Sequence, residues 1–97
     1  MTHAEVWSAI DLFAKEHKVS CSGLAKRSGL DATTFNKSKR WSKYGQPRWP
    51  STSSIAKILE STGASLYDLT KYLRILRLHT LLHSSTDKTK YTARLGG

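Results

Sequence analysis

The chain has 97 residues, with 16 Lys and Arg against 7 Asp and Glu, which gives a formal net charge of +9. This length suits one compact domain with a small core. The excess of positive charge indicates an anionic partner, either nucleic acid or an acidic membrane surface. The N-terminus lacks the pattern of a signal peptide, no window is apolar enough to span a membrane, and a single cysteine excludes an internal disulfide. We therefore expect a cytoplasmic protein.

Five helices are expected along the chain, and the first two follow one another closely. The first 19 residues repeat apolar side chains at helical spacing, and Thr2 with Glu5 fits a capping box at the start. Ser20 is a good N-cap for a short second helix over about 21–28. The pattern predicts two helices joined by a short connection.

The next stretch is typical of a tight turn followed by a third helix. Gly29 lies where a left-handed residue commonly ends a helix, and Asp31 is placed to cap a helix over 32–40. Phe35 is the one large apolar side chain of that third helix, so we expect it to anchor the helix to the core. Residues at about 21–40 therefore predict a helix-turn-helix arrangement.

Residues 41–50 contain Gly45 and two prolines without helical or strand periodicity, which indicates a loop. The loop carries three aromatic residues, Trp41, Tyr44 and Trp49. Two interpretations stay open for these rings, because they can stack on nucleotides or cover the core beneath the loop.

Two further helices are expected after this loop. Ser51 or Thr52 can cap a fourth helix that Gly63 ends, and Ser65 with Asp68 can start a fifth. The sequence thus predicts a domain over 1–70, an extension of the fifth helix over 71–83, and a flexible basic tail over 84–97.

The outward side of the predicted helix 32–40 is polar and basic. Asn can form paired hydrogen bonds with adenine, Lys can bind guanine, and the threonine methyl can contact the thymine methyl. A helix that is anchored behind by Phe35 and polar in front can enter a DNA major groove. The candidate base-reading residues are Thr33, Thr34, Asn36 and Lys37.

The segments LAKRSGLDATTFNKSKR and PSTSSIAKILESTGASLYDL together resemble the helix-turn-helix domain of phage-repressor-like (XRE/Cro-type) bacterial transcriptional regulators. The resemblance covers roughly residues 4–70. With its long loop and Trp7, the chain also resembles the N-terminal domain of repressors that carry a LexA-type peptidase, although the remaining residues are too few for that peptidase. The resemblance implies an all-α, five-helix lambda-repressor-like domain whose second and third helices contact DNA.

The resemblance also implies how a DNA duplex lies on the chain. The candidate base-reading residues would face base edges, the start of the second helix would lie near the sugar-phosphate backbone, and the basic residues that follow would flank the groove. Positive charge is concentrated in the same region, which adds Lys26 and Arg48 to the expected backbone contacts. These contacts are Cys21, Ser22, Lys26, Lys39, Arg40, Lys43 and Arg48.

The fifth helix carries more apolar residues than one packing contact needs. The excess could form a homodimer seam, or the helix could lie on a membrane, because basic residues are also present on it. We favour the dimer, since two-fold repressors need one, and a different protein partner on this helix is a further alternative. The seam residues would be Ile75, Leu76, Leu78 and Leu82.

The sequence shows no catalytic or metal-binding pattern. His79 and His83 are spaced i, i+4 without a third ligand nearby, and no nucleophile–base pair or phosphate loop is recognisable. Cys21 is either a structural thiol or, if a helix N-terminus lowers its pKa, a redox switch. We therefore expect no cofactor, no metal and no enzymatic activity.

The hypothesis from sequence is a sequence-specific, double-stranded DNA-binding transcriptional regulator, in the form of a repressor that reads the major groove with helix 32–40 as a homodimer. The alternative is an antitoxin-like or accessory protein-interaction module whose DNA binding serves autoregulation. Neither hypothesis involves a membrane.

Overall fold

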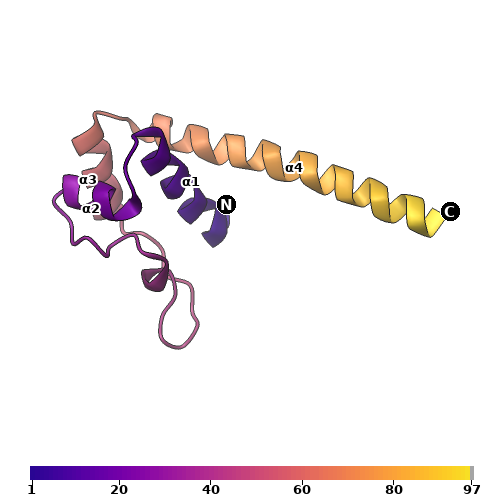
Figure 1. Ribbon diagram of the computed structural model, residues 1–97, viewed down its shortest axis with the longest axis horizontal. Coiled ribbons are helices and arrows are strands. Elements are labelled where there is room, and N and C mark those ends of the chain that lie inside the picture. Colours follow the sequence, from indigo (N-terminus) through magenta and orange to yellow (C-terminus); the bar gives the residue numbers. More distant parts are fainter. Residues whose placement is uncertain (97) are drawn as a thin grey trace.

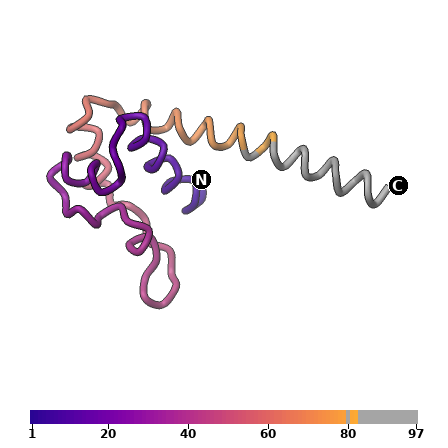
Figure 2. The backbone as a smooth tube through the Cα atoms, viewed as in Figure 1, coloured from indigo at the N-terminus to yellow at the C-terminus, as the bar shows by residue number. Residues whose placement is uncertain are grey.

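In the computed structural model the chain is mostly helical (Figure 1). The structure describes the backbone of residues 1–96 and the side chains of residues 1–79, 81 and 82 (Figure 2). In this part the expected all-α class is confirmed, because the only pairing of strand type is a single bridge between Trp41 and Pro47. The elements are α1 (His3–Glu16), α2 (Cys21–Arg27), the 3-10 helix η1 (Lys37–Lys39), α3 (Thr52–Thr62) and α4 (Leu66–Gly96).

Helix α1 lies at the centre of the fold, packed against α2 and along the first turns of α4, while α3 packs on α2 (Figure 1). Apolar side chains from every helix meet there. Leu69 and Tyr72 of α4 complete the core, and partly buried Leu76 packs against it, so the packed domain continues past residue 70. The largest fully buried side chains are Phe13, Phe35, Ile10, Leu24 and Ile58.

The expected starts of α1, α2 and α3 are confirmed. Thr2 and Glu5 form the capping box of α1, Ser20 accepts from the Gly23 N–H at the start of α2, and Ser51 accepts from the Ser54 N–H at the start of α3. Helix α1 ends at Glu16, earlier than its apolar pattern suggested, because Lys18 has a left-handed φ of 58°. The predicted tail over 84–97 lies outside the described side chains, as does His83.

The predicted third helix over 32–40 is wrong. Residues 32–35 form turns, Asn36 is extended with ψ 150°, and only Lys37–Lys39 is helical, as a 3-10 turn. The backbone bonds span three residues, as in Asn36 N–H to the Thr33 carbonyl (3.0 Å), where an α-helix needs bonds across four. The described part of the chain therefore has four α-helices, and the second α-helix of the expected helix-turn-helix is absent.

Local hydrogen bonds explain this departure. The Asp31 carboxylate accepts from both the backbone N–H and the hydroxyl of Thr33, at 2.9 and 2.6 Å. The Thr34 hydroxyl donates to the Asp31 carbonyl at 2.6 Å. Short polar side chains of this kind compete with helical hydrogen bonds, and threonine is also a weak helix former. The result is a compact run of turns in place of a helix.

Phe35 is the anchor of this irregular segment, as expected, with no exposed surface and its ring edge-on to Trp7 at 6.5 Å. Phe35→Ala should lower the free energy of unfolding by about 3–5 kcal/mol, because it opens a cavity in a small core. Thermal or urea denaturation measures the loss. Tyr44→Ala is the matched control, since Tyr44 is 80% exposed. Equal stabilities of the two variants would show that Phe35 does not anchor the segment.

Candidate nucleic-acid interface

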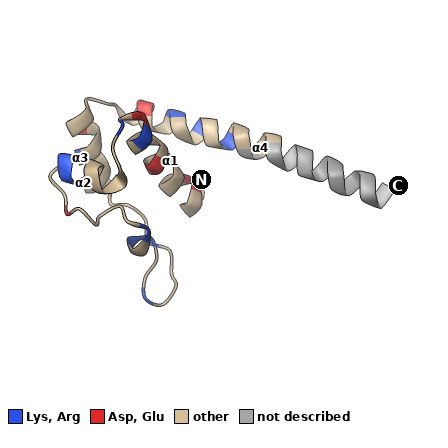
Figure 3. Cartoon of the chain, viewed as in Figure 1, with Lys and Arg blue, Asp and Glu red and all other residues tan. Residues whose placement is uncertain are grey.

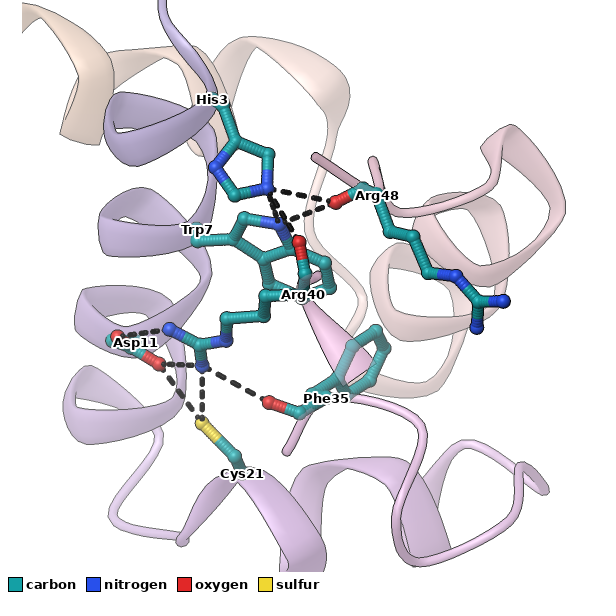
Figure 4. A network of polar contacts seen from close by, with 7 residues as sticks. All are labelled: His3, Trp7, Asp11, Cys21, Phe35, Arg40 and Arg48. Atoms are coloured by element: carbon teal, nitrogen blue, oxygen red, sulfur yellow. Dashed lines mark hydrogen bonds and ion pairs between the residues drawn. The ribbon is translucent and has the colours of Figure 1, made fainter. Parts of the chain in front are cut away.

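A half-buried ion pair joins residue 40 to α1. The Arg40 guanidinium donates to both carboxylate oxygens of Asp11, at 3.0 Å from Nη1 and 2.7 Å from Nη2 (Figure 4). Nη2 also donates to the Phe35 carbonyl at 3.0 Å. In an α-helix that carbonyl would accept from residue 39, so Arg40 takes the place of a helical hydrogen bond. The guanidinium carbon lies 4.7 Å from the centre of the Trp7 ring, a cation–π distance.

The environment of Arg40 disfavours its expected role at a DNA phosphate. Arg40 is 8% exposed as a residue, and the carboxylate of Asp11 neutralises its charge. The side chain therefore acts inside the domain, where it fixes the segment that follows Phe35. In this part of the chain, the exposed positive charge belongs to the lysines and the arginine on either side of Arg40.

Cys21 belongs to the same network (Figure 4). Its thiol donates to Asp11 Oδ1 at 3.1 Å, so the half-buried thiol is engaged in a contact within the domain. Burial, together with the hydrogen bond and charge of Asp11, raises the pKa of the Cys21 thiol to about 11. A thiol with this pKa is protonated at neutral pH and reacts poorly. The structural role of Cys21 is thus favoured over a redox switch.

Two residues of α1 hold the next stretch of chain in place. His3 Nε2 lies 2.8 Å from the Arg40 carbonyl and 2.9 Å from the Arg48 carbonyl. Both of these carbonyls are acceptors, so we assign the ring proton to Nε2. The Trp7 indole N–H lies 2.9 Å from the Arg48 carbonyl and 3.1 Å from His3 Nε2, and with this tautomer it donates to the carbonyl (Figure 4). Residues 40 and 48 are thereby fastened side by side on α1.

The chain between these two points forms a hairpin, which we call the 40–48 hairpin. The Arg48 N–H donates to the Arg40 carbonyl at 2.8 Å, and the Ser42 N–H donates to the Gln46 carbonyl at 2.7 Å. Gly45 turns the tip with a φ of 80°, a left-handed value that costs a glycine little. The hairpin projects from the helices (Figure 1).

Four exposed cations surround the hairpin and η1, and we call them the basic face. Three of them line one open hollow, and the fourth lines the neighbouring hollow together with Arg48. Figure 3 shows this charge on η1 and on the hairpin. No Asp or Glu occurs between residues 32 and 59, so no carboxylate of this segment offsets the charge. The basic face consists of Lys37, Lys39, Lys43 and Arg48.

The predicted base-reading residues lie beside the basic face, in the run of turns. Thr33 and Lys37 are exposed, whereas Thr34 and Asn36 are half-buried. Both threonine hydroxyls already donate to Asp31, so toward a base they offer only their acceptor lone pairs and their methyl groups. Asn36 and Lys37 remain as the hydrogen-bond donors of this group.

The other predicted backbone contacts are scattered. Lys26 is exposed in the last turn of α2, which lies apart from the hairpin (Figure 3). Ser22, at the start of α2, is half-buried. The structure thus groups only the basic face, and it separates Lys26 from that surface.

The predicted dimer seam is largely exposed along α4. Ile75 and Leu78 are 51% and 55% exposed, and Leu82 is 69% exposed. Leu76 differs, because it packs against the core. The exposed part of the seam therefore runs through Ile75, Leu78 and Leu82.

Sequence reasoning missed the residues that position the basic face. His3 and Asp11 are polar residues of an amphipathic helix, and no periodic signal separates an inward polar contact from a solvated one. The loop aromatics carried a partial signal. Trp41 and Trp49 pack on His3 with ring centres 4.6 and 5.7 Å away, yet both remain about half exposed.

Removing the Asp11 carboxylate tests the ion pair. Asp11→Asn should lower the free energy of unfolding at pH 7 by roughly 1–3 kcal/mol, below the full cost of breaking a buried pair because the Asp11 side chain is 41% exposed. Urea denaturation measures the difference. Glu16→Gln, an exposed carboxylate at the end of the same helix, is the control, and an Asp11→Asn protein as stable as that control would contradict the pair's importance.

The same variant gives a pH signature. Partial burial raises the pKa of Asp11, but the hydrogen bonds from Arg40 and Cys21 and the charge of Arg40 outweigh burial, so the pKa is lowered overall. A lowered folded pKa stabilises the protein above the unfolded pKa, about 3.9, and this contribution disappears as the pH falls through the folded pKa. The stability gap between wild type and Asp11→Asn should therefore narrow below about pH 4.

In the described part of the chain, no helix combines the length and the apolar character needed to cross a membrane. In comparisons with family models, with curated proteins and with solved structures, nothing matches this chain.

Proposed function

We propose that the protein is a sequence-specific, double-stranded DNA-binding transcriptional regulator, a repressor of the XRE/Cro type that its sequence resembles. The observation that carries this proposal is the basic face. Its four cations lie on adjoining elements, in a segment without carboxylates. A surface of this kind attracts the phosphates of DNA and releases their counterions.

The run of turns from Asp31 to Lys39 is the proposed reading element. It stands where the sequence resemblance expects a recognition helix, and Phe35 anchors it from behind. Asn36 and Lys37 supply the hydrogen-bond donors that adenine and guanine edges accept. The rigid attachment of this segment through Arg40 supports a reading role, because base contacts need a fixed register.

A homodimer is part of the proposal. Ile75 and Leu78 expose half of their surfaces on the same helix, and burying such side chains in a second copy would be favourable. Two copies related by a two-fold axis would present two basic faces to a palindromic site. The dimer then explains why α4 is more apolar than its packing on α1 requires.

Selection of duplexes from a random library at two salt concentrations tests the proposed function. We expect a palindromic motif that persists at the higher salt, because base contacts are less sensitive to salt than phosphate contacts. Recovery of unrelated sequences that are all lost at the higher salt would refute a sequence-reading regulator.

Two lysine variants distinguish a contact to a base from a contact to a phosphate in the same experiment. Lys37→Ala should weaken the selected duplex about 5- to 100-fold more than a random duplex, since a good base contact discriminates by about 1–3 kcal/mol. Lys43→Ala should weaken the binding of both duplexes alike. It should also reduce the slope of log K against log salt by about 0.9, for the phosphate contact that it removes. Lys15→Ala, an exposed lysine of α1, serves as the control.

A further inference from the structure

We propose that the 40–48 hairpin also binds single-stranded nucleic acid, by stacking unpaired bases on Trp41 and Tyr44. This activity goes beyond duplex recognition and concerns a different ligand. Duplex binding leaves one observation unexplained, namely the exposure of large aromatic rings beside the basic face.

The aromatic rings are exposed to an unusual extent. Tyr44 is 80% exposed, while Trp41 and Trp49 are 53% and 52% exposed. Large aromatic side chains gain more free energy than small apolar ones when they are removed from water. Three of them within nine residues indicate a surface that a ligand covers.

The hollow beside these rings has the chemistry of a nucleotide site. Trp41 and Tyr44 line it together with Lys37, Lys43 and Arg48. Aromatic rings offer flat apolar faces to bases, and the cations offer charge to the phosphates that link them. Proteins that bind single strands combine these two features. Two serines add hydroxyl groups to the lining, Ser38 and Ser42.

The Trp41 ring and the hairpin backbone are held before any ligand arrives. Trp41 packs against His3, and His3 in turn holds the carbonyls at both ends of the hairpin. Near Tyr44, its own N–H and that of Gln46 donate to the Ser42 hydroxyl oxygen, at 3.2 and 3.0 Å. A hairpin held in this way gains affinity, because little backbone freedom is lost on binding.

Unpaired nucleotides fit this surface better than the other candidate occupants. In a duplex, each base is stacked between its neighbours, so its flat face is hidden from Trp41 and Tyr44. A second copy of the same hairpin would bring Lys43 and Arg48 against their own like charges. A single strand exposes both its base faces and its phosphates, and therefore uses the rings and the cations together.

The experiment compares two labelled DNAs by fluorescence anisotropy, a 12-residue oligothymidine and a 12-base-pair duplex. We expect the 97-residue protein to bind oligothymidine at low salt. Tyr44→Ala should weaken that binding by about fivefold or more, the effect of losing one stacked base, while the duplex affinity changes less than about twofold. Tyr44→Phe keeps the ring and should bind oligothymidine nearly as wild type does.

A control and a salt series sharpen the comparison. Tyr67→Ala removes a tyrosine of similar exposure on α4 and should leave oligothymidine binding unchanged. The loss caused by Tyr44→Ala should be the same at each salt concentration, because stacking releases no counterions, whereas Lys43→Ala should lower the salt slope.

Three results would overturn the proposal. They are failure of wild type to bind oligothymidine at low salt, an equal loss of both DNAs in Tyr44→Ala, and an equal loss of oligothymidine binding in Tyr67→Ala. None of them bears on the duplex library, so the two proposals fail separately. A protein that selects no duplex motif but binds oligothymidine through Tyr44 would retain only the single-strand activity.

Discussion

The ion pair between Arg40 and Asp11 is the contact on which residues 35–48 depend. It joins α1 to the end of η1, and the same guanidinium holds the Phe35 carbonyl and lies over Trp7. A charged group that is 8% exposed is stable only with such partners. Once Arg40 is held there, its carbonyl faces His3 and the 40–48 hairpin can close. One buried residue thus fixes both the run of turns before it and the hairpin after it.

This arrangement divides the basic residues into two groups with different work. The charge of Arg40 is paired with Asp11 inside the domain, whereas the neighbouring lysines and Arg48 are exposed to solvent. Arg40 sets the geometry, and in the proposed function the exposed cations attract phosphates. A surface with fixed geometry can discriminate among base sequences, which charge alone cannot do. The proposed reading and stacking functions both rest on this division.

The sequence predicted the features that depend on local interactions. Thr2, Ser20 and Ser51 were recognisable as caps, Gly29 and Gly63 as left-handed helix ends, and each has its expected role. Phe35 was recognisable as an anchor because it is the only large apolar residue in a polar stretch. These features depend on neighbours within a few positions, which a sequence displays directly.

The remainder depends on contacts that no local pattern displays. Arg40 and Asp11 are 29 positions apart, and the sequence offers no sign that they meet. Without that contact, residues 32–40 look like a capped helix with a basic end. Hydrogen bonds disfavour an α-helix here. Asp31 bonds with Thr33 and Thr34, and the Arg40 guanidinium donates to the Phe35 carbonyl. The exposed lysines, in contrast, could be identified from the sequence without tertiary information.

The most direct test of the inner role of Arg40 is the duplex affinity of Asp11→Asn, measured at fixed salt and at a temperature where the variant is folded. Removing a carboxylate normally strengthens DNA binding, because repulsion falls. If Asp11 acts by holding Arg40, the variant should bind the selected duplex about 5- to 100-fold more weakly, as base contacts lose their register. Affinity equal to or above that of wild type would contradict a basic face that is organised from within.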